Sequence, residues 1–237
     1  MYKAYKKQVT KYFKWGDPNV TIVGSPTVSN GVVSGFSASK YITTPYLFVP
    51  STNTWEIVVK VKTGALTAVN NILGAQTAFK TGMALYINTD LDNKLGLALS
   101  SNGTSYNIVA VNKALGSKLY SANTVYYFKV EFTGSEYNAY YSLDGKQWTL
   151  DITVTSSANI IQSQPWTLGG GVIGGSASYY NTASVDLNGC HINLNGKRWW
   201  NGLKQVAGTS SDHDFTKLQD IYYAMKQNDK YYTYKGV

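Results

Sequence analysis

The sequence is poor in residues that several functional classes depend on. It contains one cysteine, Cys190, so no intramolecular disulfide can form within the chain. Only Arg198 is an arginine, although the formal net charge is +8 and lysines crowd the first fifteen residues. Because arginine dominates base and phosphate recognition, we expect no nucleic-acid partner. Cys190 falls in an alternating run, which predicts a buried, inert thiol rather than a nucleophile.

Long apolar segments are also missing. No stretch approaches the roughly 20 apolar residues of a transmembrane helix, so we expect no membrane insertion. The first seven residues, which include Lys3, Lys6 and Lys7, lack the apolar region of a Sec signal peptide. We therefore expect synthesis in a cytoplasm without a signal peptide.

The residues that are plentiful favour β-structure. The chain has 20 tyrosines and 6 tryptophans against 3 methionines, and aromatic residues are enriched in strands. Strand-sized runs separated by Gly, Asn or Asp recur about every ten residues from Val20 to Gly202, as in two-sheet sandwiches. In the clearest run, 55–62, Ile57, Val59 and Val61 face one way, and Glu56, Val58, Lys60 and Lys62 face the other. We assign Trp55, Phe128 and Phe132 to the core.

Two hairpin signals follow one another in the middle of the chain. Runs 125–132 and 137–143 both alternate, and Thr133-Gly134-Ser135 is expected to join them. Asp144-Gly145 then predicts a tight type I′ turn before Trp148, because such turns need positive φ at both central residues.

Composition divides the chain into three parts. Residues 1–19 form a basic, aromatic extension, and 20–202 hold the strand-sized runs. Residues 203–237 form a second extension, in which Ser211 or Asp212 is expected to cap a short helix over 215–227. The two ends share a Lys/Tyr character, and tyrosine is enriched in interfaces. We predict an assembly interface that contains Tyr5, Tyr12, Tyr231, Tyr232 and Tyr234.

Several segments together resemble a known family. They are 36–42, 54–61, 97–106, 124–132, 142–148 and 185–196, the last of which runs on into Lys197-Arg198-Trp199-Trp200. In this order they resemble the concanavalin A-like lectin/glucanase sandwich, in the laminin-G-like form of bacteriophage tail and fibre proteins. The resemblance covers about residues 20–202. It implies an all-β fold with a two-sheet antiparallel jelly-roll sandwich, and a place in a virion.

A sugar-binding surface needs exposed aromatic rings beside hydrogen-bonding side chains. The residues that best meet this need are Trp148, Trp166, Tyr179, Tyr180 and Asn181. Strand tryptophans and tyrosines also serve packing alone, which is the alternative explanation for each of them.

Catalytic chemistry has little support in this sequence. Glycosidases need two carboxylates close together, one with a raised pKa. The glucanases that share the fold carry Glu-x-Asp-x-x-Glu on one strand, whereas Glu56 stands alone in its run and Glu131 and Glu136 flank a turn. No Ser/His/Asp arrangement is recognisable. We therefore name no catalytic residue and do not expect an enzyme.

The only cofactor that the sequence suggests is calcium. Asp90 and Asp92 offer oxygen ligands in one short segment, although the spacing differs from an EF-hand loop. A solvated hairpin turn is the alternative explanation.

Together these features predict a non-enzymatic bacteriophage virion protein, a tail or head fibre or another appendage, made in the bacterial host cytoplasm. Its sandwich would recognise host-surface carbohydrate, and its other partners would be virion proteins or sister subunits. A purely structural attachment module is the first alternative, and a carbohydrate-active hydrolase is the second.

Overall fold

The computed structural model describes residues 20–37, 39–44, 54–67, 69–75, 82–160, 166–170, 172–173, 176–177, 182–200 and 202. The predicted extensions 1–19 and 203–237 lie outside these residues, together with the helix expected over 215–227. The proposed interface residues Tyr5, Tyr12, Tyr231, Tyr232 and Tyr234 lie outside them too. None of the helices formed by the described residues has the length and apolarity that a bilayer crossing requires.

One sheet has seven strands. In spatial order they are β1 (Thr21–Val23), β4 (Tyr41–Thr43), β13 (Trp166–Leu168), β6 (Asn70–Ala75), β7 (Met83–Asn88), β8 (Lys94–Leu99) and β9 (Val109–Leu119). The short 3-10 helix η1 (Thr89–Leu91) lies between β7 and β8. The pairings in this sheet are all antiparallel.

The second sheet has nine strands and is also antiparallel. Its order is β12 (Thr149–Thr155), β11 (Glu136–Ser142), β10 (Val125–Phe132), β5 (Trp55–Thr63), β16 (Thr182–Asp186), β3 (Val32–Ser34) and β2 (Thr27–Ser29). After the 3-10 helix η2 (Leu187–Gly189), β17 (His191–Leu194) pairs with the first half of β5, and β18 (Lys197–Trp200) pairs with β17. A separate ribbon consists of β14 (Val172–Ile173) and β15 (Ser176–Ala177).

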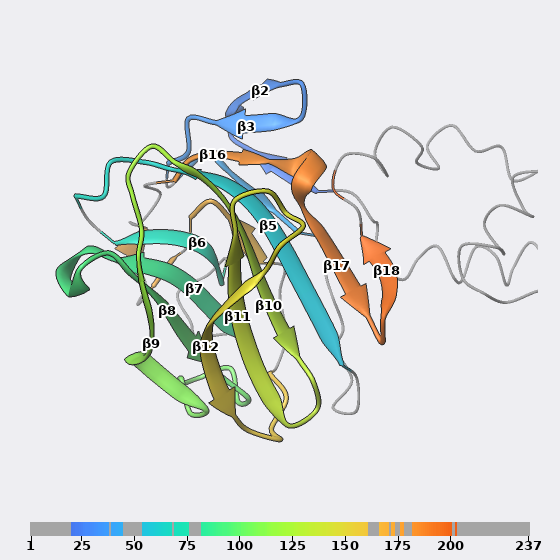
Figure 1. Cartoon of the computed structure of the whole chain (residues 1–237). Coiled ribbons are helices and arrows are strands. Elements are labelled where there is room, and N and C mark those ends of the chain that lie inside the picture. Colours follow the sequence, from blue (N-terminus) through green and yellow to red (C-terminus); the bar gives the residue numbers. More distant parts are fainter. Residues whose placement is uncertain are drawn as a thin grey trace, which may run out of the picture.

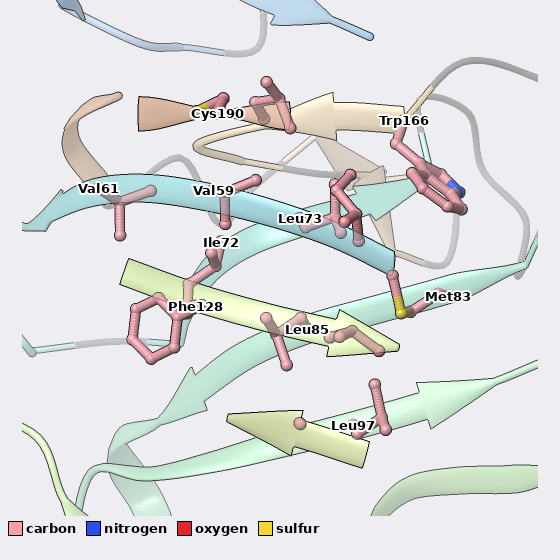
Figure 2. Packing of buried hydrophobic residues seen from close by; sticks show 14 of the residues in the cluster. Val59, Val61, Ile72, Leu73, Met83, Leu85, Leu97, Phe128, Trp166 and Cys190 are labelled. Carbon is pink, nitrogen blue, oxygen red and sulfur yellow. The ribbon is translucent and has the colours of Figure 1, made fainter. Parts of the chain in front are cut away.

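The two sheets face each other across one apolar core. Figure 1 shows β5, β10, β11 and β12 in front of β6, β7 and β8. Figure 2 shows side chains of the nine-stranded sheet, such as Val59 and Phe128, packed with Ile72 and Leu85 of the other sheet. The predicted core residues Trp55, Phe128 and Phe132 are all buried. The predicted all-β, two-sheet antiparallel jelly-roll sandwich is therefore confirmed.

Alternation along β5 divides its side chains between the core and the outside. Trp55, Ile57, Val59 and Val61 belong to the core cluster, as the sequence predicts. Successive side chains of a strand point to opposite faces, so Glu56, Val58, Lys60 and Lys62 lie on the outer face. The same rule places the odd-numbered residues of β10 outside, because Tyr126, Phe128, Val130 and Phe132 are buried in the core.

Asp151 joins the edges of the two sheets. Its side chain, from β12, accepts hydrogen bonds from the backbone N–H groups of Ser117 (2.8 Å) and Lys118 (3.1 Å) on β9. It also accepts the Tyr120 hydroxyl at 2.8 Å. A Cβ added at Gly116 would come within 2.1 Å of the Asp151 carboxylate, so the close approach requires glycine there. This contact closes one side of the sandwich.

Two local predictions have different outcomes. Cys190 is buried, as predicted, and burial raises the pKa of its thiol to about 12, which disfavours the reactive thiolate. The tight type I′ turn at Asp144-Gly145 is wrong. β11 ends at Ser142, β12 begins at Thr149, and Gly145 has positive φ whereas Asp144 does not. The segment forms a longer loop instead, organised by the side chains of Ser142 and Asp144.

Candidate functional site

Strand register brings charged residues together on the outer face of the nine-stranded sheet. Glu56 of β5 pairs with Glu131 of β10, and Val58 pairs with Lys129. On the next strand, β11, Tyr140 pairs with Lys129. On the other side of β5, β17 places His191 opposite Val58. Side chains at paired positions on one face lie about 5 Å apart, so this register gathers residues that are distant in the sequence.

The 143–148 loop is held by its own side chains. Ser142 Oγ accepts the backbone N–H groups of Asp144 (3.2 Å) and Gly145 (2.9 Å) and donates to Asp144 Oδ1 at 2.9 Å. Asp144 Oδ1 also accepts the N–H groups of Gln147 (2.9 Å) and Lys146 (2.8 Å). These backbone donors, together with Ser142, lower the pKa of Asp144 to about 2. The loop is therefore anchored by a carboxylate that stays ionised.

This loop lies on the sheet rather than projecting from it. In Figure 1 the yellow loop between β11 and β12 lies in front of β10. A Cβ added at Gly145 would come within 2.9 Å of the Tyr127 ring, and Gly145 has a φ of +71°. Both the contact and the left-handed conformation favour glycine. As a result Trp148, at the end of the loop, is held above β10.

Lys129 is at the centre of the resulting group. Its Nζ lies 4.1 Å from the centroid of the Tyr140 ring and 5.4 Å from that of the Trp148 ring. It forms an ion pair with Glu131 at 3.3 Å and lies 4.0 Å from the Glu56 carboxylate. An ammonium beside aromatic faces is attracted by the ring quadrupole. We call Glu56, Lys129, Glu131, Tyr140, Trp148 and His191 the Trp148 cluster.

Both carboxylates of the cluster are tied to neighbouring side chains. His191 Nε2 lies 3.6 Å from Glu56 Oε1, and Asn193 Nδ2 donates to the same oxygen. The interaction with His191 lowers the pKa of Glu56, burial opposes it, and the charge of Lys129 adds to the lowering. The Tyr140 hydroxyl donates to Glu131 Oε1 at 2.6 Å. Burial and this carboxylate raise the pKa of Tyr140 to about 12, so it stays a donor.

The arrangement combines an apolar platform with ionised groups. Trp148 is half-buried, which leaves part of its indole accessible. The side chains of Glu56 and Glu131 are 26% and 23% exposed, so both carboxylates reach solvent beside the ring. Such a surface can bind a ligand with an apolar face and several hydrogen-bonding groups.

The predicted glycan-binding residues have different fates. Trp148 lies in the cluster described above. Trp166 is fully buried on β13, 5.9 Å from the Trp55 ring, so the prediction that it stacks on a sugar is wrong. The inward face of β13 carries both Trp166 and Leu168, which explains the burial. Tyr179, Tyr180 and Asn181 lie outside the described residues.

Asp90 and Asp92 lie in the turn between β7 and β8. The Asn88 side chain caps η1 by accepting the Asp90 N–H at 2.9 Å, and Asp92 follows in the left-handed conformation. The Asp92 side chain is 80% exposed and lies 4.0 Å from the Lys94 ammonium. Among the described residues, no three His, Cys, Asp or Glu side chains are grouped to hold a metal ion. Calcium binding here stays a prediction.

Sequence reasoning missed most of the cluster. It treated Glu56 as isolated and placed Glu131 with Glu136, whereas the structure pairs Glu131 with Glu56 across β5 and β10. Lys129, Tyr140 and His191 were not considered as site residues. The available signal was their outward position in predicted strands, but only the register shows which outward residues become neighbours.

The outer face of the other sheet is different. At β7 and β8 it consists of Ala84, Tyr86 and Ala98, all buried, with Val69 and Tyr106 packed on them. The Tyr86 hydroxyl donates to Asn112 Oδ1 at 3.1 Å and accepts the Asn112 N–H at 2.8 Å. We call Ala84, Tyr86 and Ala98 the covered face.

No protein-family model matches the sequence, and no curated protein matches it. Among solved structures, the chain is similar to the Ruminococcus gnavus IT-sialidase CBM40 bound to α2,3-sialyllactose, with 16% identity, 67% of this chain and 83% of that chain covered, and a TM-score of 0.44. It is also similar to the VIP36 exoplasmic/lumenal domain in its Ca²⁺/Man-bound form, with 13% identity, 74% of this chain and 82% of that chain covered, and a TM-score of 0.46. A third similar structure is a bifunctional GH43-CE protein of Bacteroides eggerthii, with 14% identity, 71% of this chain and 23% of that chain covered, and a TM-score of 0.41. Similarity at these identities concerns the course of the strands and carries no binding-site residue across.

Proposed function

We propose that this chain is a non-enzymatic carbohydrate-binding protein and that the Trp148 cluster is its binding surface. The observation that carries the proposal is a partly exposed indole fixed beside two carboxylates, an ammonium and an imidazole. A pyranose ring has an apolar C–H face and a rim of hydroxyls. It therefore needs an aromatic platform with hydrogen-bonding groups at its border.

The cluster is preorganised for such a ligand. The Ser142 and Asp144 side chains hold the loop, Tyr127 supports it from below, and Lys129 contacts the Trp148 ring. A surface that is already ordered loses little conformational entropy on binding. This favours recognition by a fixed face over recognition by a loop that must first fold.

Binding without hydrolysis fits the electrostatics of Glu56. A glycosidase needs one carboxyl group with a raised pKa that acts as the general acid. His191 and Lys129 instead lower the pKa of Glu56, and Lys129 is ion-paired with Glu131. A reducing-sugar release assay tests this directly. Release of sugar that Glu131→Gln abolishes would favour the hydrolase alternative.

A glycan array followed by titration calorimetry tests the proposed site. We expect at least one oligosaccharide to bind, and Trp148→Ala to weaken binding by roughly tenfold or more, since a central aromatic contact dominates such surfaces. Leu119→Ala is the matched control, because Leu119 is 57% exposed on the other sheet. Equal losses in both variants, or no loss with Trp148→Ala, would contradict the site.

We propose further that the setting is a bacteriophage virion, in which the sandwich serves a tail or head appendage. The support is the likeness of segments such as 124–132 and 185–196 to those of phage structural proteins. An antiserum against the chain should label purified particles from lysed host cells. Labelling of soluble lysate fractions alone would contradict the virion setting and leave the binding site untouched.

A further inference from the structure

We infer that the Trp148 cluster selects uncharged sugars and rejects sugars that carry a carboxylate. The inference rests on the proposed function, because it assigns a ligand class to the same surface. Two observations support it. The lysine of the cluster is less exposed than its two glutamates, and the cluster has more hydrogen-bond acceptors than donors available to a ligand.

The lysine side chain of the cluster is less exposed than its two glutamate side chains. The Lys129 side chain is 16% exposed, against 23% for Glu131 and 26% for Glu56. The Lys129 ammonium is also paired with Glu131 and flanked by the Tyr140 and Trp148 rings. An approaching ligand therefore meets two carboxylates before it meets the ammonium between them. The cluster sets two carboxylates against one ammonium, beside the His191 imidazole.

The hydrogen-bonding groups of the cluster also favour a neutral sugar over an acidic one. Tyr140 and Asn193 already donate to Glu131 and Glu56, and Asn193 Oδ1 is buried without a partner. Ionised carboxylates only accept, and each offers about four lone-pair sites, so acceptors remain in surplus. A sugar hydroxyl donates to such acceptors, whereas a ligand carboxylate brings further acceptors and a like charge.

Other lysines of this face do not reverse the charge. Lys60 is bound to Asp186 at 2.7 Å, which leaves that pair neutral. Lys62 is exposed, but it lies six positions after Glu56 on β5, about 20 Å away at the usual rise per residue. Among the lysines whose side chains the structure describes, Lys146 is exposed in the same loop as Trp148, so it is the residue to test as an anchor for acidic sugars.

The test uses a matched pair of ligands. One is a neutral oligosaccharide that the array identifies, and the other is the same compound with the primary alcohol of its terminal sugar oxidised to a carboxylate. By titration calorimetry at about 0.1 M ionic strength, we expect the neutral compound to bind about fivefold or more tightly, given the strength of partly screened charge repulsion at this range.

Three variants assign the selectivity to residues. Glu131→Gln and Glu56→Gln keep the side-chain shape. Each should reduce the ratio of the affinity for the neutral compound to that for the oxidised compound by roughly threefold. Glu136→Gln is the control: it removes a carboxylate from the same strand as Tyr140, four residues away and about 13 Å distant, beyond the screening length in ordinary buffer. It should leave the preference unchanged.

The outcomes separate this inference from the proposed function. If the oxidised compound binds equally or better and Trp148→Ala still abolishes binding, the selectivity is wrong and the site stands. Loss of that binding in Lys146→Gln would identify the acid anchor. A preference that survives both Gln variants would overturn the role of Glu56 and Glu131. If neither compound binds the wild-type chain, the proposed function fails, and the inference fails with it.

Discussion

The two outer faces of the sandwich are built from opposite kinds of residue. The covered face has alanines around Tyr86, and both Val69 and Tyr106 pack on it. The outer face of the nine-stranded sheet has long charged side chains, which pair with one another and stay partly exposed. Small outward side chains let other segments pack directly on the covered face. Paired charged side chains on the other sheet stay accessible to water, because burying them is costly.

Gly96 shows how closely the covered face is packed. A Cβ added there would lie 2.4 Å from the Tyr86 ring. On the other face, the 143–148 loop lies over Tyr127, and Trp148 at its end lies with its ring centroid 5.4 Å from the Lys129 ammonium. The covered face is therefore filled by packing, and the outer face of the nine-stranded sheet keeps the partly exposed charged side chains of the proposed binding surface.

The largest loss of stability is expected from a substitution in the core between the two sheets. Trp55→Ala should lower the free energy of unfolding by about 3–5 kcal/mol, the usual cost of removing a buried tryptophan. The Trp55 ring lies 6.0 Å from Tyr137 and 5.9 Å from Trp166, and its Nε1 donates to Asn159 at 3.0 Å. Denaturant unfolding followed by fluorescence measures the change in the free energy of unfolding. A change below 1 kcal/mol would move Trp55 out of the core.

The next effect separates the two faces. Tyr86→Phe should cost about 1–3 kcal/mol, because both hydrogen bonds between the Tyr86 hydroxyl and Asn112 are lost and each contributes about 0.5–1.5 kcal/mol. Glycan binding should not change, since Tyr86 lies on the covered face. Unfolding curves and calorimetry on the same sample compare the two quantities. Weaker glycan binding with unchanged stability would show that the covered face takes part in recognition.

A substitution within the 143–148 loop should lower both stability and glycan binding. Gly145→Ala should cost about 1–2 kcal/mol, because its φ is +71° and the new Cβ would meet the Tyr127 ring. Displacement of the loop should also move Trp148 and weaken glycan binding. Gly134→Ala is the matched control: its φ is +101°, but an added Cβ has nothing within 4 Å. Equal binding by both variants would show that the loop does not position Trp148.

The smallest effect concerns pH. His191 and Lys129 lower the folded-state pKa of Glu56 below the ordinary value of 4.5. The resulting stabilisation is full above that ordinary pKa and is lost as the pH falls through the lowered one. For a partly exposed group it amounts to about 1 kcal/mol or less. Glu56→Gln should therefore reduce the loss of stability between pH 5 and acidic conditions in unfolding titrations. An unchanged slope would contradict the pairing.

Sequence alone was enough for what depends on local pattern. Alternation in β5 and β10 predicted the core positions of Trp55 and Phe128, and Cys190 was predicted to be buried. It failed at Trp166, whose burial depends on which sheet face its short strand presents. It failed also at Glu56 and Glu131, because the pairing of β5 with β10 joins residues far apart in the chain and no local pattern specifies that register.

A crystal structure with an oligosaccharide from the array tests the central claim most directly. The account predicts a sugar ring against the exposed side of Trp148, with hydroxyls within hydrogen-bond distance of Glu131 or Glu56. A sugar bound over the covered face, beside Tyr86 and Tyr106, would contradict it.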